Sequence, residues 1–197
     1  MRRCYFPNGN GPDGLPYVDY VVGDGETDAG PAIDPGVLAL YAYEQIDIAP
    51  VSMGLAPEPG PDTLGLVGLP VWMWVEDPDA TTFGPASIDL SVGPVSVSLT
   101  ARVERIEWDM GDGTVVTCTG PGTPYTPARG ATASPDCGHR YEQTSAGRSG
   151  DSFDVTATAY WVAQWSSNSG AGGTLTNTTQ ATEQVRIGES QVIVTRD

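Results

Sequence analysis

The side chains that enzymes use for acid–base, nucleophilic and metal chemistry are scarce in this sequence. There is one histidine, His139, and all nine basic residues are arginines. Without lysine the chain has neither the lysine of a phosphate-binding P-loop nor a Schiff-base nucleophile, and a single histidine excludes a multi-histidine metal centre. No Gly-x-Ser-x-Gly segment marks a serine nucleophile. We therefore expect no catalytic residue, no cofactor and no bound metal, and we predict that the chain is not an enzyme.

Paired carboxylates are the chemistry that the composition leaves open. Two acidic side chains in a cleft can hydrolyse a glycosidic bond, and several together can hold calcium. Asp109 and Asp112 are close in sequence, but an Asp-Gly turn accounts for them. The spacing of a calcium-binding EF-hand loop is absent there. A hydrolase with a carboxylate-based site is therefore kept only as a second alternative function.

The charge of the chain narrows the classes of partner. The formal net charge is −16, and a chain this acidic repels phosphate backbones, so no nucleic acid or anionic membrane is expected as a partner. The segment Gly9-x-Gly11-x-x-Gly14 has the spacing of a dinucleotide fingerprint, but Pro12 interrupts it and no strand precedes it, so no nucleotide is expected. The longest apolar stretch, residues 64–75, is shorter than the about 20 residues of a transmembrane helix, so no transmembrane segment is expected.

The three cysteines suggest the compartment. Cys118 and Cys137 enclose a proline-rich segment without histidine or zinc-type spacing, and a disulfide between them is predicted. Because disulfides persist in oxidising compartments, we expect an extracellular or cell-envelope location. Cys4 is then expected to pair with another chain or with sequence upstream. The first residues carry two arginines but no apolar segment, so the chain as written has no signal peptide.

The N-terminal part is predicted to be largely irregular. Residues 1–62 read as a Pro/Gly-rich acidic extension with one helix at about 35–46. The helix signal is Asp34 as N-cap followed by Pro35, whose fixed φ suits the first helical position. Residues 49–62 are either a connector or an edge segment lying on the sheet.

A β-sandwich is predicted for residues 63–197, because apolar and polar side chains alternate there with a period of two. Residues 95–103 alternate regularly. The apolar side chains lie at odd-numbered positions up to Val103 and then at even-numbered positions, Ile106 and Trp108. This change favours a bulge between Val103 and Ile106. Residues 153–165 are apolar at every second position, which is typical of one long strand with a buried face. A Ser/Gly-rich hairpin comes next. Shorter strands are expected at residues 175–179, 182–187 and 191–195.

The most informative motif is Trp-Asp-Met-Gly-Asp-Gly at residues 108–113. Its Asp-Gly pair is a strong hairpin signal, and its tryptophan is placed to fill a core between sheets. A His-x-Tyr motif at residues 139–141 and a strand beginning at Phe153 follow. This order resembles the polycystic-kidney-disease (PKD) domain family over residues 86–195, which implies an immunoglobulin-like antiparallel β-sandwich. The motif residues are Trp108, Asp109, Gly111, Asp112, Gly113, His139 and Tyr141.

A longer stretch, residues 34–195, resembles secreted actinobacterial PKD-domain-containing proteins of unassigned function. The resemblance lies in residues 65–74, in the Trp-Asp-Met-Gly-Asp-Gly turn, and in residues 134–141 and 188–192. It implies a signal peptide and further cysteines ahead of the point where this chain begins, which fits an unpaired Cys4.

These features predict a secreted or cell-envelope, non-catalytic β-sandwich module that mediates protein or polysaccharide interactions. The first alternative is a structural or accessory component of an envelope assembly. Trp72 and Trp74 share one parity of a predicted strand and allow two interpretations. They are either core residues packed against the N-terminal helix, or an exposed aromatic surface that stacks on sugar rings or seats a protein partner.

Overall fold

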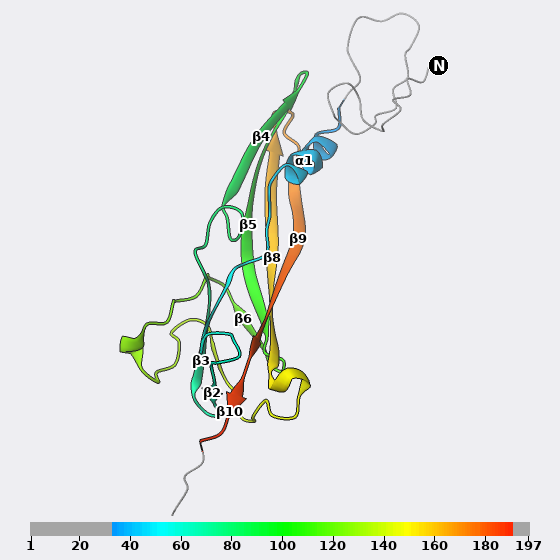
Figure 1. Ribbon diagram of the computed structural model, residues 1–197. Coiled ribbons are helices and arrows are strands. Elements are labelled where there is room, and N and C mark those ends of the chain that lie inside the picture. The colour runs from blue at the N-terminus through cyan, green and yellow to red at the C-terminus, as the bar shows by residue number, and fades with distance from the viewer. Residues whose placement is uncertain (1–32, 191–197) are drawn as a thin grey trace, which may run out of the picture. The chain divides into compact units, whose positions relative to one another are not determined.

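The computed structural model describes residues 33–190, which are mainly β, with antiparallel sheets and one short α-helix (Figure 1). They form two compact units. The first comprises residues 33–47, Ala86–Ala101 and Ala163–Leu175, and the second comprises Ile48–Pro85, Arg102–Val162 and residues 176–190. Three long strands contribute residues to both units: β5 (Val95–Asp109), β8 (Phe153–Ser167) and β9 (Gly172–Val185).

Helix α1 (Pro35–Glu44) belongs to the first unit and begins where the sequence predicts. The Asp34 carboxylate accepts the Gly36 N–H at 2.7 Å, which satisfies one of the free donors of the first turn. The helix ends earlier than the predicted residue 46. Its last turn tightens because the Gln45 N–H bonds to the Ala42 carbonyl, three residues back, at 3.1 Å.

The core of the first unit lies between α1 and a β-hairpin. Strand β4 (Ala86–Val92) pairs antiparallel with the first half of β5. Leu38 and Ala42 of the helix pack with Val97 of β5. Partly buried apolar side chains surround this cluster, namely Ile33, Ile88, Leu90, Val92, Val95 and Trp165. The helix is thus attached to the sheet by apolar contacts.

The second unit is layered. Strands β1 (Met53–Ala56), β3 (Pro70–Val75) and β7 (Gly138–Arg140) form a three-stranded antiparallel sheet with β3 in the centre. The other layer consists of β5, β8, β9 and β6 (Val115–Cys118), which pairs with the end of β5. A parallel pair, β2 (Gly65–Leu66) and β10 (Ile187–Gly188), completes it. The buried core includes Val71, Met73, Ile106, Trp108, Val155, Ala157 and Trp161. The predicted antiparallel β-sandwich with one short helix is confirmed.

The long strands follow the predicted alternation, with one difference. In β8 every second side chain from Phe153 to Ala163 is buried. In β5 the buried side chains are odd-numbered up to Val103 and even-numbered from Ile106. The pairing partner of the strand changes from β4 to β6 in the same region. Strand β9 is continuous rather than divided into two short strands, because it lies beside the similarly long β8. The strand predicted at 191–195 and Cys4 lie outside the described residues.

Residues 49–62 take the second of their two predicted forms. Strand β1 lies in this segment and occupies an edge of the three-stranded sheet. Part of the predicted extension is therefore regular structure, while its boundary at residue 62 stays a prediction. Within residues 33–190, no helix has the length and apolar character needed to span a membrane.

Candidate functional site

The turn after β5 is shaped by its two carboxylates. Asp109 Oδ1 accepts the Gly111 N–H at 2.9 Å, and Asp112 Oδ1 accepts the Thr114 N–H at 2.9 Å. These bonds to the local backbone define a tight turn, which the Asp-Gly pair predicts. The other two motif residues here are Trp108, which is buried, and Gly113, whose φ is 96°.

His139 and Tyr141 join this turn to the three-stranded sheet. His139 Nε2 lies 2.8 Å from Asp112 Oδ2. The Tyr141 hydroxyl donates to the Met110 carbonyl at 2.9 Å. The Tyr141 ring meets His139 edge-on at 4.7 Å and stacks on Phe153 at 4.4 Å between ring centroids. The structure therefore brings Asp112, His139 and Tyr141 into one cluster.

The electrostatics of this cluster strengthen the hydrogen bonds that brace the turn. Burial opposes the charge on Asp112, but hydrogen bonds from Thr114 and His139 outweigh it, so the pKa of Asp112 lies below its usual range. Burial, and then the charges of Asp112 and Asp109, raise the pKa of Tyr141, which keeps its hydroxyl a donor. The hydrogen-bond partner of the imidazole is the Asp112 carboxylate, which the turn also holds through the Thr114 N–H. No group of three or more His, Cys, Asp or Glu side chains that could hold a metal occurs within residues 33–190.

Replacing Asp112 with asparagine is expected to lower the free energy of unfolding near neutral pH by about 1 kcal/mol, because a neutral amide accepts more weakly. The folded-state pKa of Asp112 is lowered, so the contribution of the carboxylate is present above its unfolded pKa of about 3.9. It is lost as the pH falls through the folded value. Urea denaturation measures the free energy of unfolding of Asp112→Asn and of the unsubstituted protein. The difference between the two should therefore shrink as the pH falls toward about 2. An equal difference at every pH would contradict this account.

The predicted disulfide joins Cys118 to Cys137, with 5.8 Å between their Cα atoms. It closes residues 119–136, here called the cysteine loop. Strand β3 donates backbone N–H groups to both ends of this loop, to the Pro121 carbonyl at 2.7 Å and to the Cys137 carbonyl at 3.1 Å. The loop is therefore fastened along the central strand of the small sheet as well as by its sulfurs.

The close approach of the loop to β3 depends on Gly122. Its φ is 79°, a left-handed conformation that glycine adopts without strain. A Cβ atom there would lie 2.6 Å from the Met73 carbonyl oxygen and 2.9 Å from the Trp74 Cα. Because both neighbours are backbone atoms of a central strand, they cannot move aside cheaply. Gly122 is the residue type that this contact requires.

Trp72 and Trp74 do not form an exposed aromatic surface. They are 1% and 9% exposed, because β3 is buried on both of its faces. Trp72 meets Tyr125 edge-on at 5.5 Å and donates its indole N–H to the Thr132 carbonyl at 2.8 Å. Trp74 donates its indole N–H to Glu76 at 2.6 Å. Their partners lie in the cysteine loop and just after β3, rather than in the helix.

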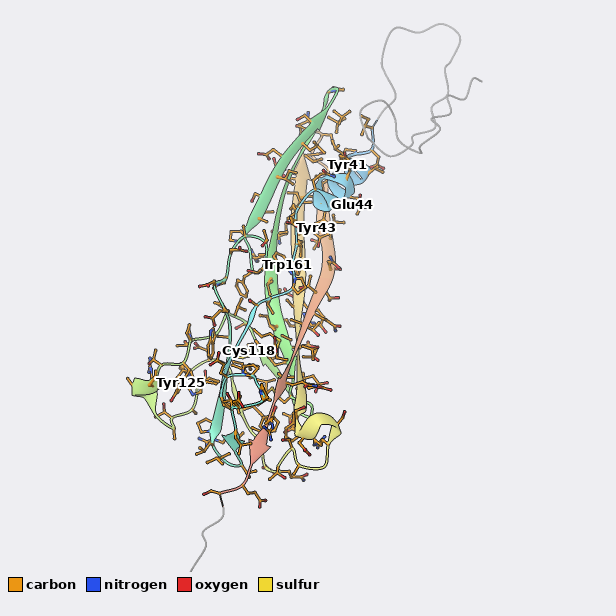
Figure 2. The ribbon with its side chains drawn as sticks, viewed as in Figure 1. Tyr41, Tyr43, Glu44, Cys118, Tyr125 and Trp161 are labelled. Carbon is orange, nitrogen blue, oxygen red and sulfur yellow. A yellow bond between two sulfur atoms is a disulfide. The ribbon has the colours of Figure 1, made fainter. Side chains whose placement is uncertain are left out.

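Tyr125 is an aromatic residue to which the sequence assigned no role. Figure 2 shows it in the cysteine loop, which leaves the sheet at Cys118. Its ring covers Trp72, and its hydroxyl donates to the Gly130 carbonyl at 3.2 Å. The signal in the sequence was a single aromatic side chain within a loop of small and proline residues.

Two surface hollows meet at Tyr125, and together we call them the Tyr125 groove. Both are lined by Ala56, Pro57 and Tyr125. The first hollow, of about 310 Å³, has an apolar lining that includes Leu64 and Leu69. These two leucines are 54% and 44% exposed. Large apolar side chains left open beside a hollow are typical of a surface that a partner covers.

The second hollow of the groove is acidic. It is lined by residues 52–59 around β1, which include Glu58, together with Trp74, Glu76 and Glu183. No basic residue lines it, and none of the three glutamates forms an ion pair within the described part of the chain. The groove therefore presents a negative half and an apolar half on either side of Ala56 and Pro57.

Comparisons with known proteins add little to this geometry. No protein-family model matches the chain, and no curated protein matches it. Among solved structures, the crystal structure of the PKD1 domain of Vibrio anguillarum Epp is similar at 13% identity and a TM-score of 0.15. The match covers 52% of this chain and 92% of that chain. A TM-score this low carries no argument, so the PKD resemblance rests on the sequence motifs.

Proposed function

We propose that this chain is a non-catalytic interaction module that works outside the cell or in its envelope, and that it binds a protein partner through the Tyr125 groove. The observation that carries the proposal is an open, half-apolar groove whose wall is a loop closed by the Cys118–Cys137 disulfide. A stable disulfide fits an oxidising compartment. A covalently closed loop limits the conformational entropy lost on binding.

Two further observations support a protein partner over the alternatives. Trp72 and Trp74, the aromatic pair available to stack on sugars, are buried, which weighs against a polysaccharide. Asp109 and Asp112 each accept a backbone N–H of their own turn, which weighs against a carboxylate-based hydrolase that uses them as its acidic pair. The secreted actinobacterial resemblance is consistent with the same location. An accessory role in an envelope assembly is compatible with this surface, since such a component also binds proteins.

The proposal predicts that the chain enriches peptides from a displayed random library and that the enrichment depends on the groove. Leu64→Asp combined with Leu69→Asp is expected to lower the affinity for the selected peptides by about tenfold or more, because charged side chains then replace the apolar contacts. Val115→Asp is the matched control, since Val115 is 57% exposed and lies outside both hollows. Equal binding by the double variant and the control would overturn the proposal, as would selective binding on a glycan array with no peptide enriched.

A further inference from the structure

Strand β1 has a free edge, and this edge lies in the Tyr125 groove. In the antiparallel pairing of β1 with β3, the Glu76 N–H bonds to the Ser52 carbonyl at 2.8 Å, and Gly54 lies opposite Trp74. Hydrogen-bonded pairs alternate in such a ladder, so the backbone groups of Met53 and Leu55 point away from β3.

The outward groups of β1 have no partner among residues 33–190. Strand β1 is the end strand of its sheet, and no hydrogen bond joins the backbone of Met53 or Leu55 to any described residue on that side. Two N–H and two carbonyl groups thus lack a partner among these residues beside the acidic hollow, which residues 52–59 line; Met53 is half-buried and Leu55 is 4% exposed. Open strand edges are sites where an extended peptide can add as a further strand.

The edge is also limited at one end. Pro57 follows β1 directly and lacks an N–H, so pairing cannot continue past it. Beyond Pro57 the lining changes to Leu64, Leu66 and Leu69 of the apolar hollow. A segment that pairs with Met53 and Leu55 would reach these leucines with its side chains rather than with its backbone.

We propose, building on the function proposed above, that the Tyr125 groove binds an extended segment of a partner protein that adds as a strand to β1. The segment carries basic side chains over the acidic hollow and apolar side chains over the leucines. The choice of basic residues follows from charge complementarity with Glu58, Glu76 and Glu183. The backbone pairing supplies affinity and the two hollows supply specificity.

The nearby cations leave the acidic hollow open to such a segment. Arg129 lies over the Trp72 ring, at 6.0 Å from its centroid. Arg186 donates to the Pro61 carbonyl and lines a neighbouring hollow. Neither lines the acidic half of the groove, although Arg186 shares the neighbouring hollow with Glu183.

The first test measures charge. Fluorescence anisotropy follows a short, labelled peptide with arginines in one half and leucines in the other, and a second peptide in which glutamates replace the arginines. The arginine peptide is expected to bind and the glutamate peptide not to. Glu58→Gln combined with Glu183→Gln should lower the affinity for the arginine peptide about fivefold at low salt. The effect should be smaller at high salt, because the charges are then screened. Glu142→Gln with Asp89→Asn is the matched control, since both acids are exposed and lie outside the groove.

The second test measures backbone pairing. N-methylation of alternate peptide amides blocks the N–H groups that face β1 in one series and those that face solvent in the other. The series methylated at the amides that face β1 is expected to bind about tenfold more weakly. The series methylated at the amides that face solvent is expected to bind normally. Equal affinity of both series, or no effect of the glutamate substitutions, would overturn strand addition of a basic segment. If library peptides still bind in a way that depends on Leu64 and Leu69, the proposed function stands while this inference fails.

Discussion

Replacing Cys118 and Cys137 together with alanine is expected to lower the free energy of unfolding by about 3 kcal/mol. The bridge spans a sequence separation of 19, and removing it restores conformational freedom to a loop that contributes little apolar surface of its own. Both sulfurs are buried, so the substitution also removes packing. Urea denaturation followed by tryptophan fluorescence measures the change, because the loop covers Trp72.

The control for this experiment is Cys4→Ala, which removes a thiol but not the bridge. It is expected to leave the unfolding midpoint unchanged under oxidising conditions. Reducing the unsubstituted protein should reproduce most of the loss seen in the double variant. A double variant as stable as the oxidised protein would show that contacts of the cysteine loop with β3, rather than the bridge, hold the loop in place.

Gly54→Ala is expected to cost about 2 kcal/mol, because the new methyl group overpacks a closed site. Gly54 lies directly opposite Trp74 on the neighbouring strand, and the indole ring lies over it. A Cβ atom at Gly54 would fall 2.1 Å from the ring. The ring has little room to move, since its N–H is bonded to Glu76 and Gly122 packs against its Cβ.

The matched control is Gly120→Ala, where a Cβ atom would meet nothing within 4 Å. That substitution is expected to be neutral or slightly stabilising, because alanine reduces the freedom of the unfolded chain. Thermal and urea denaturation of the two variants should separate them clearly. If Gly54→Ala were as stable as Gly120→Ala, the position of Trp74 over β1 would be wrong.

Local signals explain what the sequence predicted correctly. The start of α1 follows from Asp34 and Pro35, whose effects act within one turn. The buried face of β8 follows from strict alternation over residues 153–165. The disulfide follows from a proline-rich segment enclosed by two cysteines. Each of these conclusions needs only neighbouring residues, so one sequence suffices for them.

The candidate site could not be predicted in the same way. The burial of Trp72 depends on the cysteine loop, which covers the second face of β3 from about fifty residues downstream. Alternation alone indicates one buried face and cannot reveal a cover of this kind. The groove likewise combines Pro57, Leu69 and Tyr125, whose proximity is set by tertiary structure rather than by spacing.

The way the cysteine loop is attached has a consequence for how this protein can change. Its two ends are held by the bridge and by hydrogen bonds to β3, whereas the short 3-10 turn in its middle, Pro127–Arg129, is exposed and contributes no buried residue. Arg129 lies over Trp72, and the Thr132 carbonyl accepts the Trp72 indole N–H, so the fold places few demands only on Pro127 and Ala128, which are close in the chain to Gly130 and Ala131 of the groove. Mutation can accumulate there and alter recognition while the scaffold is preserved, and the same position can accept a grafted peptide for display.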